Sequence, residues 1–286
     1  MNADSAFAIG KRHEVCQDYA KAEVDGEWGK AWVSDGCSSS PDSDIGARLM
    51  VLSARQSFRA MLETGWNLKT SSPEEIGMMT MCSARTSANG LGLSPEVLDA
   101  TLLSIMCDGE YVCLSAFGDG VLFLKWEHGS TKCLDIELTN GYPDYLSYRF
   151  DKERRNKYDS VWVDTKANKL VRDMSWLDGK LENYQERGFD PHNGYGEIHQ
   201  IKQGVAKLEL AAVMSDGVKS FYRRSKNGAN EVVPLSEVLE SLMNFRLHSG
   251  RFVQRRLNAF LKDAAVKGWE HHDDISIAAI HFSEVS

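Results

Sequence analysis

Ala31-Trp32-Val33-Ser34-Asp35-Gly36-Cys37 is an apolar run that stops on an acidic residue and a glycine, and a helical pattern follows it. Such a run is typical of a strand that presents a carboxylate at the end of a sheet. The same construction returns from Leu210 to Gly217, with the sequence LAAVMSDG. A third acidic position, Asp273-Asp274, precedes the last apolar run, 275–282, although this pair alone also fits a solvated charged segment. Because Mg²⁺ and Mn²⁺ prefer oxygen ligands, three strand ends with carboxylates suggest a site for a hard metal ion.

Asp-Gly pairs can also be interpreted as hairpin turns. Both central residues of a type I′ turn need a positive φ, and Asp-Gly is one of the pairs preferred there. The pairs at 25–26 and 108–109 each lie between strand-like runs, so we interpret both as turns. The pair at 119–120 fits either interpretation. A polar linker and a helical pattern follow 35–36, and a loop-like segment follows 216–217, so a turn explains these two pairs less well.

Composition limits the class of protein. A chain of 286 residues with 42% hydrophobic residues can bury a large core, and we expect one domain over 1–286. Lys and Arg number 33 against 41 Asp and Glu, a net charge of −8, which argues against binding of nucleic acid by a basic surface. No apolar run reaches the roughly 18 residues of a membrane span, and the N-terminus lacks the order of a signal peptide. We therefore expect a cytoplasmic protein without membrane contact. The six cysteines form no C-x-x-C pair, so they give no zinc signal.

Hydrophobic periodicity predicts strands grouped around pairs of helices. A helix over 41–64 is expected to begin after Ser40 as its cap and to end at Gly65. Four strand-like stretches between 97 and 138, joined by short turns, predict a β-meander. The predicted elements are strands 5–9, 30–34, 97–106, 111–117, 121–126, 132–138, 206–214 and 275–282, and helices 41–64, 73–89, 235–247 and 252–267. Since β-α-β alternation is rare, we expect an α+β fold, a sandwich of two antiparallel sheets covered by helices.

Residues 139–201 follow no hydrophobic period. Charged residues, Tyr, Gly and Asn dominate this stretch, which predicts an irregular insertion. Connections of this length are usually functional or mobile.

Five short motifs occur in a recognisable order along almost the whole chain. They are Gly10…His13…Cys16-Gln17-Asp18, then Ser34-Asp35-Gly36, Phe117-Gly118-Asp119, Ser215-Asp216-Gly217 and Asp273-Asp274-Ile275-Ser276. In this order they resemble the metal-dependent Ser/Thr protein phosphatases of the protein phosphatase 2C type, and most of all their compact bacterial branch. Each motif alone is weak, but five in order are fairly specific.

The resemblance implies a four-layer sandwich of two central antiparallel β-sheets flanked by helix pairs, and it implies a role for each acidic position. Asp35 would bridge two Mn²⁺ or Mg²⁺ ions, and the Gly36 carbonyl would bind the second ion. Asp216 and Asp273 would complete the first. Asp18 would hold metal-bound water, Asp119 would help to hold a possible third ion, and 139–201 would be a flap-like insertion beside the catalytic cleft.

The implied reaction is hydrolysis of phosphoserine and phosphothreonine in a phosphorylated protein, by a hydroxide that bridges both ions and without a covalent phosphoenzyme. Two hard ions roughly 3.5 to 4 Å apart lower the pKa of a shared water and aim it at phosphorus. Hydrolysis of a phosphate monoester is among the slowest uncatalysed reactions, so a strong nucleophile and charge neutralisation are needed together.

The chain departs from the family pattern at positions that bear on catalysis. His13 stands where many relatives hold the phosphate with an arginine, which makes His13 a candidate for that role and for proton donation. Cys37 stands where some relatives have a histidine as general acid, and Asp274 where Asn is common. A nucleophilic role for Cys37 is disfavoured because the C-x5-R signature of cysteine phosphatases is missing and acidic neighbours would raise a thiol pKa.

Two other functions stay open at this point. The loss of the arginine and of an evident general acid fits a catalytically weak or inactive phosphatase-like module that senses a phosphoprotein. A phosphatase for small molecules fits as well, since the insertion would set the specificity. The sequence does not indicate an oligomeric state.

Overall fold

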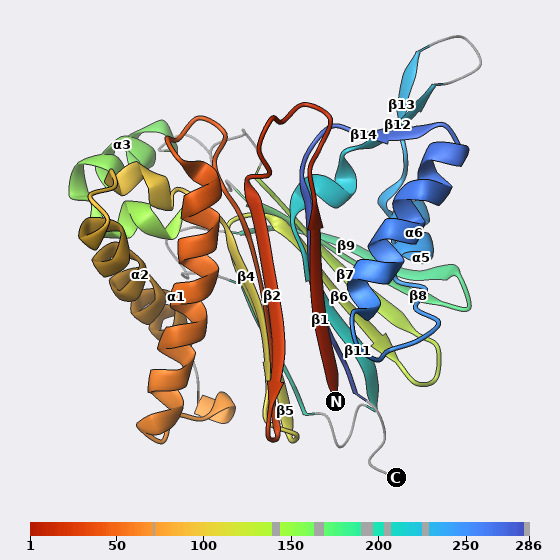
Figure 1. The fold of residues 1–286 in the computed structure, drawn as a ribbon. Helices are drawn as coiled ribbons and strands as arrows, with labels where there is room; N and C mark the ends of the chain where they lie inside the picture. The colour runs from red at the N-terminus through yellow and green to blue at the C-terminus, as the bar shows by residue number, and fades with distance from the viewer. Residues whose placement is uncertain are drawn as a thin grey trace.

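Two antiparallel sheets face each other in the centre of the molecule, with helices outside both (Figure 1). The structure is a computed structural model, and it describes residues 1–70, 72–138, 144–162, 169–189, 197–202, 207–224 and 229–282. One central sheet has five strands in the order β10-β5-β4-β3-β2, and the other has seven in the order β1-β15-β11-β6-β7-β8-β9. A third, small sheet has the order β13-β12-β14.

The strands of the five-stranded sheet are β2 (Asp18–Asp25), β3 (Trp28–Asp35), β4 (Leu102–Cys107), β5 (Tyr111–Phe117) and β10 (Glu197–Lys202). Those of the seven-stranded sheet are β1 (Asn2–Ala8), β6 (Gly120–Trp126), β7 (Thr131–Leu138), β8 (Lys169–Leu177), β9 (Lys180–Phe189), β11 (Leu208–Met214) and β15 (Ile275–His281). The small sheet contains β12 (Phe221–Arg224), β13 (Asn230–Val232) and β14 (Trp269–His271). The described helices are α1 (Ser43–Glu63), α2 (Pro73–Gly90), α3 (Lys152–Trp162), α5 (Leu235–Leu242) and α6 (Phe252–Val266).

Strands that are buried on both faces build the layers. In β4, Leu103 and Ile105 belong to the apolar core between the two sheets, whereas Leu102 and Met106 belong to the core beneath α1 and α2. Alternate side chains of a strand point to opposite faces, so one strand supplies both cores. A further core lies between the seven-stranded sheet and α5 and α6. The order of layers is therefore helix pair, sheet, sheet, helix pair, and the predicted four-layer α+β sandwich is confirmed.

Local signals set the ends of the two helices that cover the five-stranded sheet. The Ser72 hydroxyl accepts the backbone N–H of Glu75, and the Glu75 carboxylate accepts the N–H of Ser72, a capping box at the start of α2. The predicted Ser40 cap of α1 is wrong. Asp42, with φ at 49°, precedes the first helical residue, and no side chain caps this end. At the other end Gly65 has φ at 80°, as expected for a glycine that terminates a helix.

The predicted β-meander between 97 and 138 is wrong in one connection. β4 and β5 form a hairpin, and so do β6 and β7, but β5 and β6 lie in different sheets. The chain crosses at Gly118 and Gly120, whose φ angles of 95° and 138° suit glycine best. Strands buried on both faces show no alternation that would separate a hairpin from a crossing, which explains the error.

The segment 139–201 differs from the irregular insertion expected. Its described part contains α3, β8, β9 and most of β10, while 139–143, 163–168 and 190–196 lie outside the described residues. β8 and β9 extend the seven-stranded sheet, and β10 pairs with β5 at the edge of the other sheet. Most of β9 is exposed, so it lacks the alternation of polar and apolar residues by which a strand is recognised.

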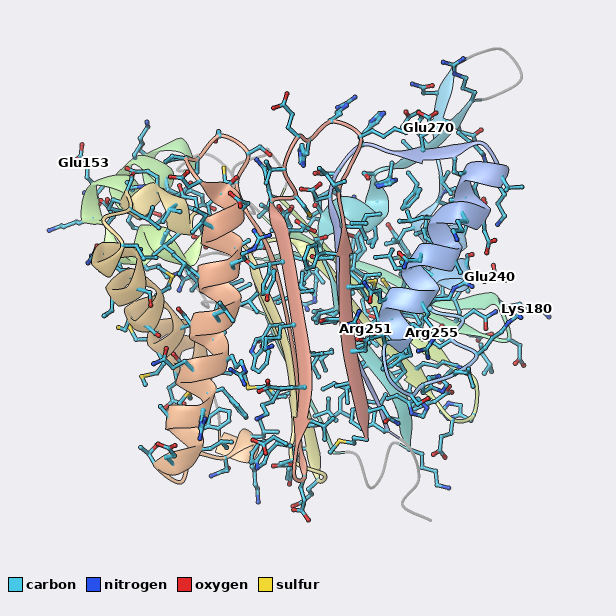
Figure 2. All side chains as sticks on the ribbon, in the orientation of Figure 1. Glu153, Lys180, Glu240, Arg251, Arg255 and Glu270 are labelled. Atoms are coloured by element: carbon cyan, nitrogen blue, oxygen red, sulfur yellow. The ribbon has the colours of Figure 1, made fainter. Side chains whose placement is uncertain are left out.

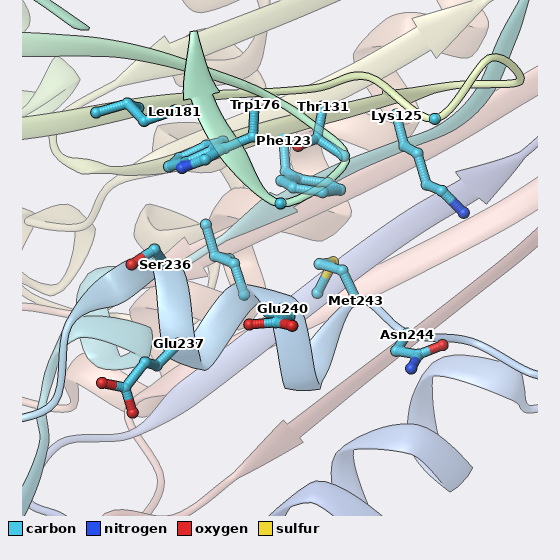
Figure 3. Close-up of a pocket in the computed structure, with 13 residues that line it drawn as sticks. Phe123, Lys125, Thr131, Trp176, Leu181, Ser236, Glu237, Glu240, Met243 and Asn244 are labelled. Atoms are coloured by element: carbon cyan, nitrogen blue, oxygen red, sulfur yellow. The ribbon is translucent and has the colours of Figure 1, made fainter. Parts of the chain in front are cut away.

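The outer strands of the seven-stranded sheet stand away from α5 and leave a cavity of about 490 Å³. Phe123, Trp176 and Leu181 line it from the sheet, and Glu240 and Met243 line it from the side of α5 (Figure 3). None of the predicted metal ligands lines this cavity. None of the helices in the described ranges is long and apolar enough to cross a membrane.

Candidate metal centre

Sheet topology brings the acidic positions to one end of the sandwich. Asp18 begins β2 and Asp35 ends β3, and the two are directly paired across the hairpin. Asp216 follows β11, and Asp273 precedes β15, its antiparallel neighbour. Asp119 precedes β6, which pairs with the other edge of β11. In antiparallel neighbours the end of one strand meets the start of the next, so Asp18 and Asp35 meet at one end of the five-stranded sheet, and Asp119, Asp216 and Asp273 meet at one end of the seven-stranded sheet.

Electrostatics show that these carboxylates lie close to one another. Burial, and next the negative charges of Asp18 and Asp216, hold the pKa of Asp35 well above its usual value, and Asp273 and Asp119 act in the same direction. Burial raises the pKa of Asp18 to about 7, even though hydrogen bonds from serines lower it. Burial and Asp216 also raise the pKa of Asp273. Without a cation, several of these groups would hold protons at neutral pH.

Two oxygens of the cluster are buried without a hydrogen-bond partner among the described residues. They are Oδ1 of Asp18 and Oδ1 of Asp216. The other oxygen of Asp18 accepts the hydroxyl proton of Ser215 at 2.6 Å. A buried carboxylate oxygen without a donor is costly, and a hard divalent cation supplies the missing partner either directly or through a water that it holds. The residues at this end of the molecule therefore fit Mg²⁺ or Mn²⁺.

The glycines after Asp35 and Asp216 are needed for close packing. A Cβ at Gly36 would come within 2.3 Å of the Ser43 carbonyl oxygen, and one at Gly217 within 1.7 Å of the Asp274 carbonyl oxygen. Neither glycine has a positive φ, so neither pair is a hairpin turn of the primed types. Gly26 and Gly109 do have positive φ, at 62° and 86°, with open space around them, so both predicted turns are confirmed.

Asp274 holds the segment between β1 and β2 over the acidic cluster. Its Oδ1 accepts the N–H of Gly10 at 2.7 Å, and its Oδ2 accepts the N–H of Gln17 at 2.6 Å. Asp274 is 2% exposed, whereas the side chain of Asp273 is 41% exposed. Of the two adjacent aspartates, Asp273 is thus the one available to a ligand. Local sequence could not indicate this division, because the groups that Asp274 holds are more than 250 residues away in the chain.

His13 lies inside this arrangement. Its Nδ1 is 2.8 Å from Oδ2 of Asp274, and its Nε2 is 3.6 Å from Oδ1 of Asp273. Its side chain is 18% exposed, so it is not the solvated histidine that a polar loop usually carries. Lys11, in the same segment, pairs with Glu270 at 3.0 Å, and Figure 2 labels Glu270 at this end of the molecule. The β1–β2 segment therefore brings a histidine to the site, while its Lys11 side chain is paired with β14.

The sequence analysis missed a partly buried cation beside the cluster. The ammonium of Lys219 is 3.0 Å from Oδ1 of Asp135, and the charges of Asp135, Asp216 and Asp119 raise its pKa although burial lowers it. Its place three residues after Asp216 was the available signal. A fixed positive charge here offsets part of the repulsion among the carboxylates.

The expectation for the Cys37 thiol is wrong. Burial raises its pKa, but hydrogen bonds with Ser39 and Tyr145 outweigh burial, and the net pKa is lowered. Its Sγ lies 3.1 Å from the hydroxyl of Ser39. Local sequence could not indicate this lowered pKa, because Tyr145 belongs to a segment more than 100 residues away.

A comparison of sequences agrees with the geometry of the acidic cluster. A sequence profile described as protein phosphatase 2C matches residues 10–262. The chain belongs to the protein phosphatase 2C family. The resemblance found in the motifs is thereby confirmed, and by family the chain is a protein-serine/threonine phosphatase. The matched range includes Asp18, Asp35, Asp119 and Asp216 and ends before Asp273.

Solved structures of phosphatases share this protein phosphatase 2C fold. A bacterial serine phosphatase aligns with a TM-score of 0.55 and 8% identity, over 100% of this chain and 99% of that chain. The serine/threonine phosphatase of S. agalactiae aligns with a TM-score of 0.52 and 12% identity, over 98% of this chain and 99% of that chain. The PP2C domain of SiaA from Pseudomonas aeruginosa aligns with a TM-score of 0.50 and 13% identity, over 98% of this chain and 86% of that chain. At such identities the likeness shows the fold. No curated protein matches the chain.

Proposed function

We propose that this phosphatase hydrolyses phosphoserine and phosphothreonine in proteins with the help of two Mn²⁺ or Mg²⁺ ions. Asp35 would bind both ions, the Gly36 carbonyl one of them, and Asp216 and Asp273 the other, with Asp119 beside a possible third. The observation that carries the proposal is the pair of buried, unpartnered oxygens on Asp18 and Asp216 around Asp35 within the described residues. When bound, the ions supply an activated water and neutralise the charge of the phosphate.

The protein's own groups have defined tasks in this proposal. Ser215 fixes one oxygen of Asp18, so the other oxygen is aimed into the cluster, where it can accept a proton from water. His13 is oriented by Asp273 and Asp274, which suits it to donate a proton to the leaving serine or threonine oxygen. Lys219 adds a fixed positive charge beside Asp216.

We further propose that residues 1–286 form a single phosphatase domain, with 139–201 as a flap-like insertion that influences the choice of substrate. β10, at the end of this segment, pairs with β5, the strand that leads to Gly118 and Asp119. This pairing supports a position of the segment near the acidic end. The cytoplasmic location stays a prediction.

Hydrolysis of para-nitrophenyl phosphate and of a phosphothreonine peptide tests the proposal. Activity should require added Mn²⁺ or Mg²⁺, should disappear with a chelator and should be lost in Asp35→Asn. Asp25→Asn is the matched control, because Asp25 lies in a hairpin turn with its side chain 81% exposed. Metal-independent turnover that survives in Asp35→Asn would contradict the mechanism. A protein that binds phosphopeptide but leaves it intact on long incubation would support the binding module instead.

A further inference from the structure

Three potential metal ligands meet at the other end of the strand pair that carries Asp216 and Asp273. Glu209 is the second residue of β11, His281 is the last residue of β15, and His248 lies between α5 and α6. One ligand atom from each lies within 4.8 Å of the others. Glu209 lies seven positions before Asp216, a span of about 23 Å along a strand. This histidine–glutamate cluster is therefore separate from the acidic cluster.

Backbone pairing fixes the positions of Glu209 and His281. Leu210 is paired with His281 across the β11–β15 ladder, and the N–H of Phe282 donates to the carbonyl of Glu209 at 2.9 Å. Both residues therefore lie on adjacent strands of the central sheet. Ligands placed on a rigid sheet are more precisely positioned than ligands on a loop.

Hydrogen bonds hold the chain just after His248 in place. Oδ2 of Asp4, in β1, accepts the N–H groups of Val253 and Gln254 at 2.7 and 3.1 Å, at the start of α6. Arg251, just before α6, is labelled in Figure 2 at the opposite end of this helix from Glu270. The His248 ring stacks on the His281 ring with centroids 3.7 Å apart and planes within 10°. The two imidazoles therefore lie face to face, and one ring must turn before a nitrogen of each can point at the same ion.

Both imidazoles have lone pairs to offer at neutral pH. Nδ1 of His281 is buried and has no hydrogen-bond partner among the described residues. A neutral imidazole is the form that binds a metal ion. An unpaired buried nitrogen costs free energy, which coordination of a metal would recover.

We propose that Glu209, His248 and His281 form a second metal site, selective for Zn²⁺ and similar transition-metal ions. Two imidazole nitrogens and one carboxylate oxygen suit Zn²⁺, whereas Mg²⁺ prefers oxygen ligands alone. Three protein ligands leave a fourth position for water or another small ligand. A bound ion would tie β11, β15 and the α5–α6 segment together. The proposal does not depend on the phosphatase mechanism.

Lys125 limits the affinity of this site. Its ammonium lies 2.7 Å from Oε1 of Glu209 and places a positive charge beside the cluster. A carboxylate can accept from several partners, so Glu209 can hold Lys125 and a metal ion together. The repulsion between Lys125 and the ion should nevertheless weaken binding. Lys125→Met, which keeps the chain length and removes the charge, should therefore bind Zn²⁺ more tightly than the unchanged protein.

Calorimetry with Zn²⁺ tests the site, with the acidic cluster kept saturated by Mg²⁺. The unchanged protein should bind Zn²⁺, and His248→Ala and His281→Gln should each weaken binding by more than about 100-fold, since losing even an outer partner of a ligand costs 10- to 100-fold. His128→Ala is the matched control, because His128 lies in the β6–β7 turn and contacts Ser130. Wild-type affinity in both cluster variants, or an equal loss in the control, would overturn the proposal.

Diffraction at the zinc absorption edge gives a second readout that needs no variant. Crystals of the full chain grown with Mg²⁺ and Zn²⁺ should show an anomalous peak between Glu209, His248 and His281. Zinc bound only at the acidic cluster or at a cysteine would overturn the proposal even if the histidine variants failed to fold.

Discussion

Replacement of Asp274 tests how the β1–β2 segment is held over the acidic cluster. In Asp274→Ala the N–H groups of Gly10 and Gln17 lose their shared acceptor in a buried or partly buried setting. A buried donor left without a partner costs about 1 to 3 kcal/mol, so the free energy of unfolding should fall by about 2 to 6 kcal/mol. That is a large part of the roughly 5 to 15 kcal/mol that stabilises a typical domain.

Asp274→Asn should be the milder change. Its amide oxygen can still accept one of the two N–H groups, while its NH₂ group meets the other donor. The expected loss is therefore about half that of the alanine variant. Urea denaturation of the metal-free protein at pH 7 measures both, with Glu27→Ala in the exposed β2–β3 turn as control. If Asp274→Ala lay within about 0.5 kcal/mol of the control, Asp274 would not be the anchor of this segment.

Three further predictions concern the same end of the molecule. Metal-free protein should lose stability as pH rises from about 4 to 7, because native Asp18 keeps its proton up to a pKa of about 7 while the unfolded chain releases it near 4. Asp35 also keeps its proton over this range, so the slope in Asp18→Asn should be smaller than in the unchanged protein by up to about 1.4 kcal/mol per pH unit, whereas the same slope in both proteins would assign the effect elsewhere. Gly217→Ala should destabilise the protein by several kcal/mol or prevent folding, because its Cβ would meet the Asp274 carbonyl, while Gly90→Ala, with open space around it, should be neutral in thermal unfolding. His13→Gln should lower kcat by about 10²- to 10⁴-fold for a phosphopeptide, but much less for para-nitrophenyl phosphate, whose leaving group needs no proton; equal losses on both substrates would argue against proton donation.

Local patterns predicted the acidic positions because each stands beside a buried strand. Asp35 and Asp216 end apolar runs, and Asp273 precedes one, so the sequence alone marks them as strand-end carboxylates. Antiparallel pairing then brings the ends of neighbouring strands together within each sheet. The fold class followed from the same strand and helix patterns.

Local patterns could not predict long-range hydrogen-bond partners or the connections of strands that are buried on both faces. Asp274 is engaged and Asp273 is available to a ligand because N–H groups near the start of the chain donate to Asp274. The crossing between β5 and β6 is hidden because both strands are buried. The histidine–glutamate cluster joins positions 209, 248 and 281, which no local pattern connects.

The location of Mn²⁺ by anomalous diffraction tests the central claim most directly. Crystals of the full chain grown with Mn²⁺ should show two peaks roughly 3.5 to 4 Å apart, both within bonding distance of Asp35. Asp216 and Asp273 should contact one of them, and Asp274 neither. A manganese-loaded crystal without a peak at Asp35 would contradict the account.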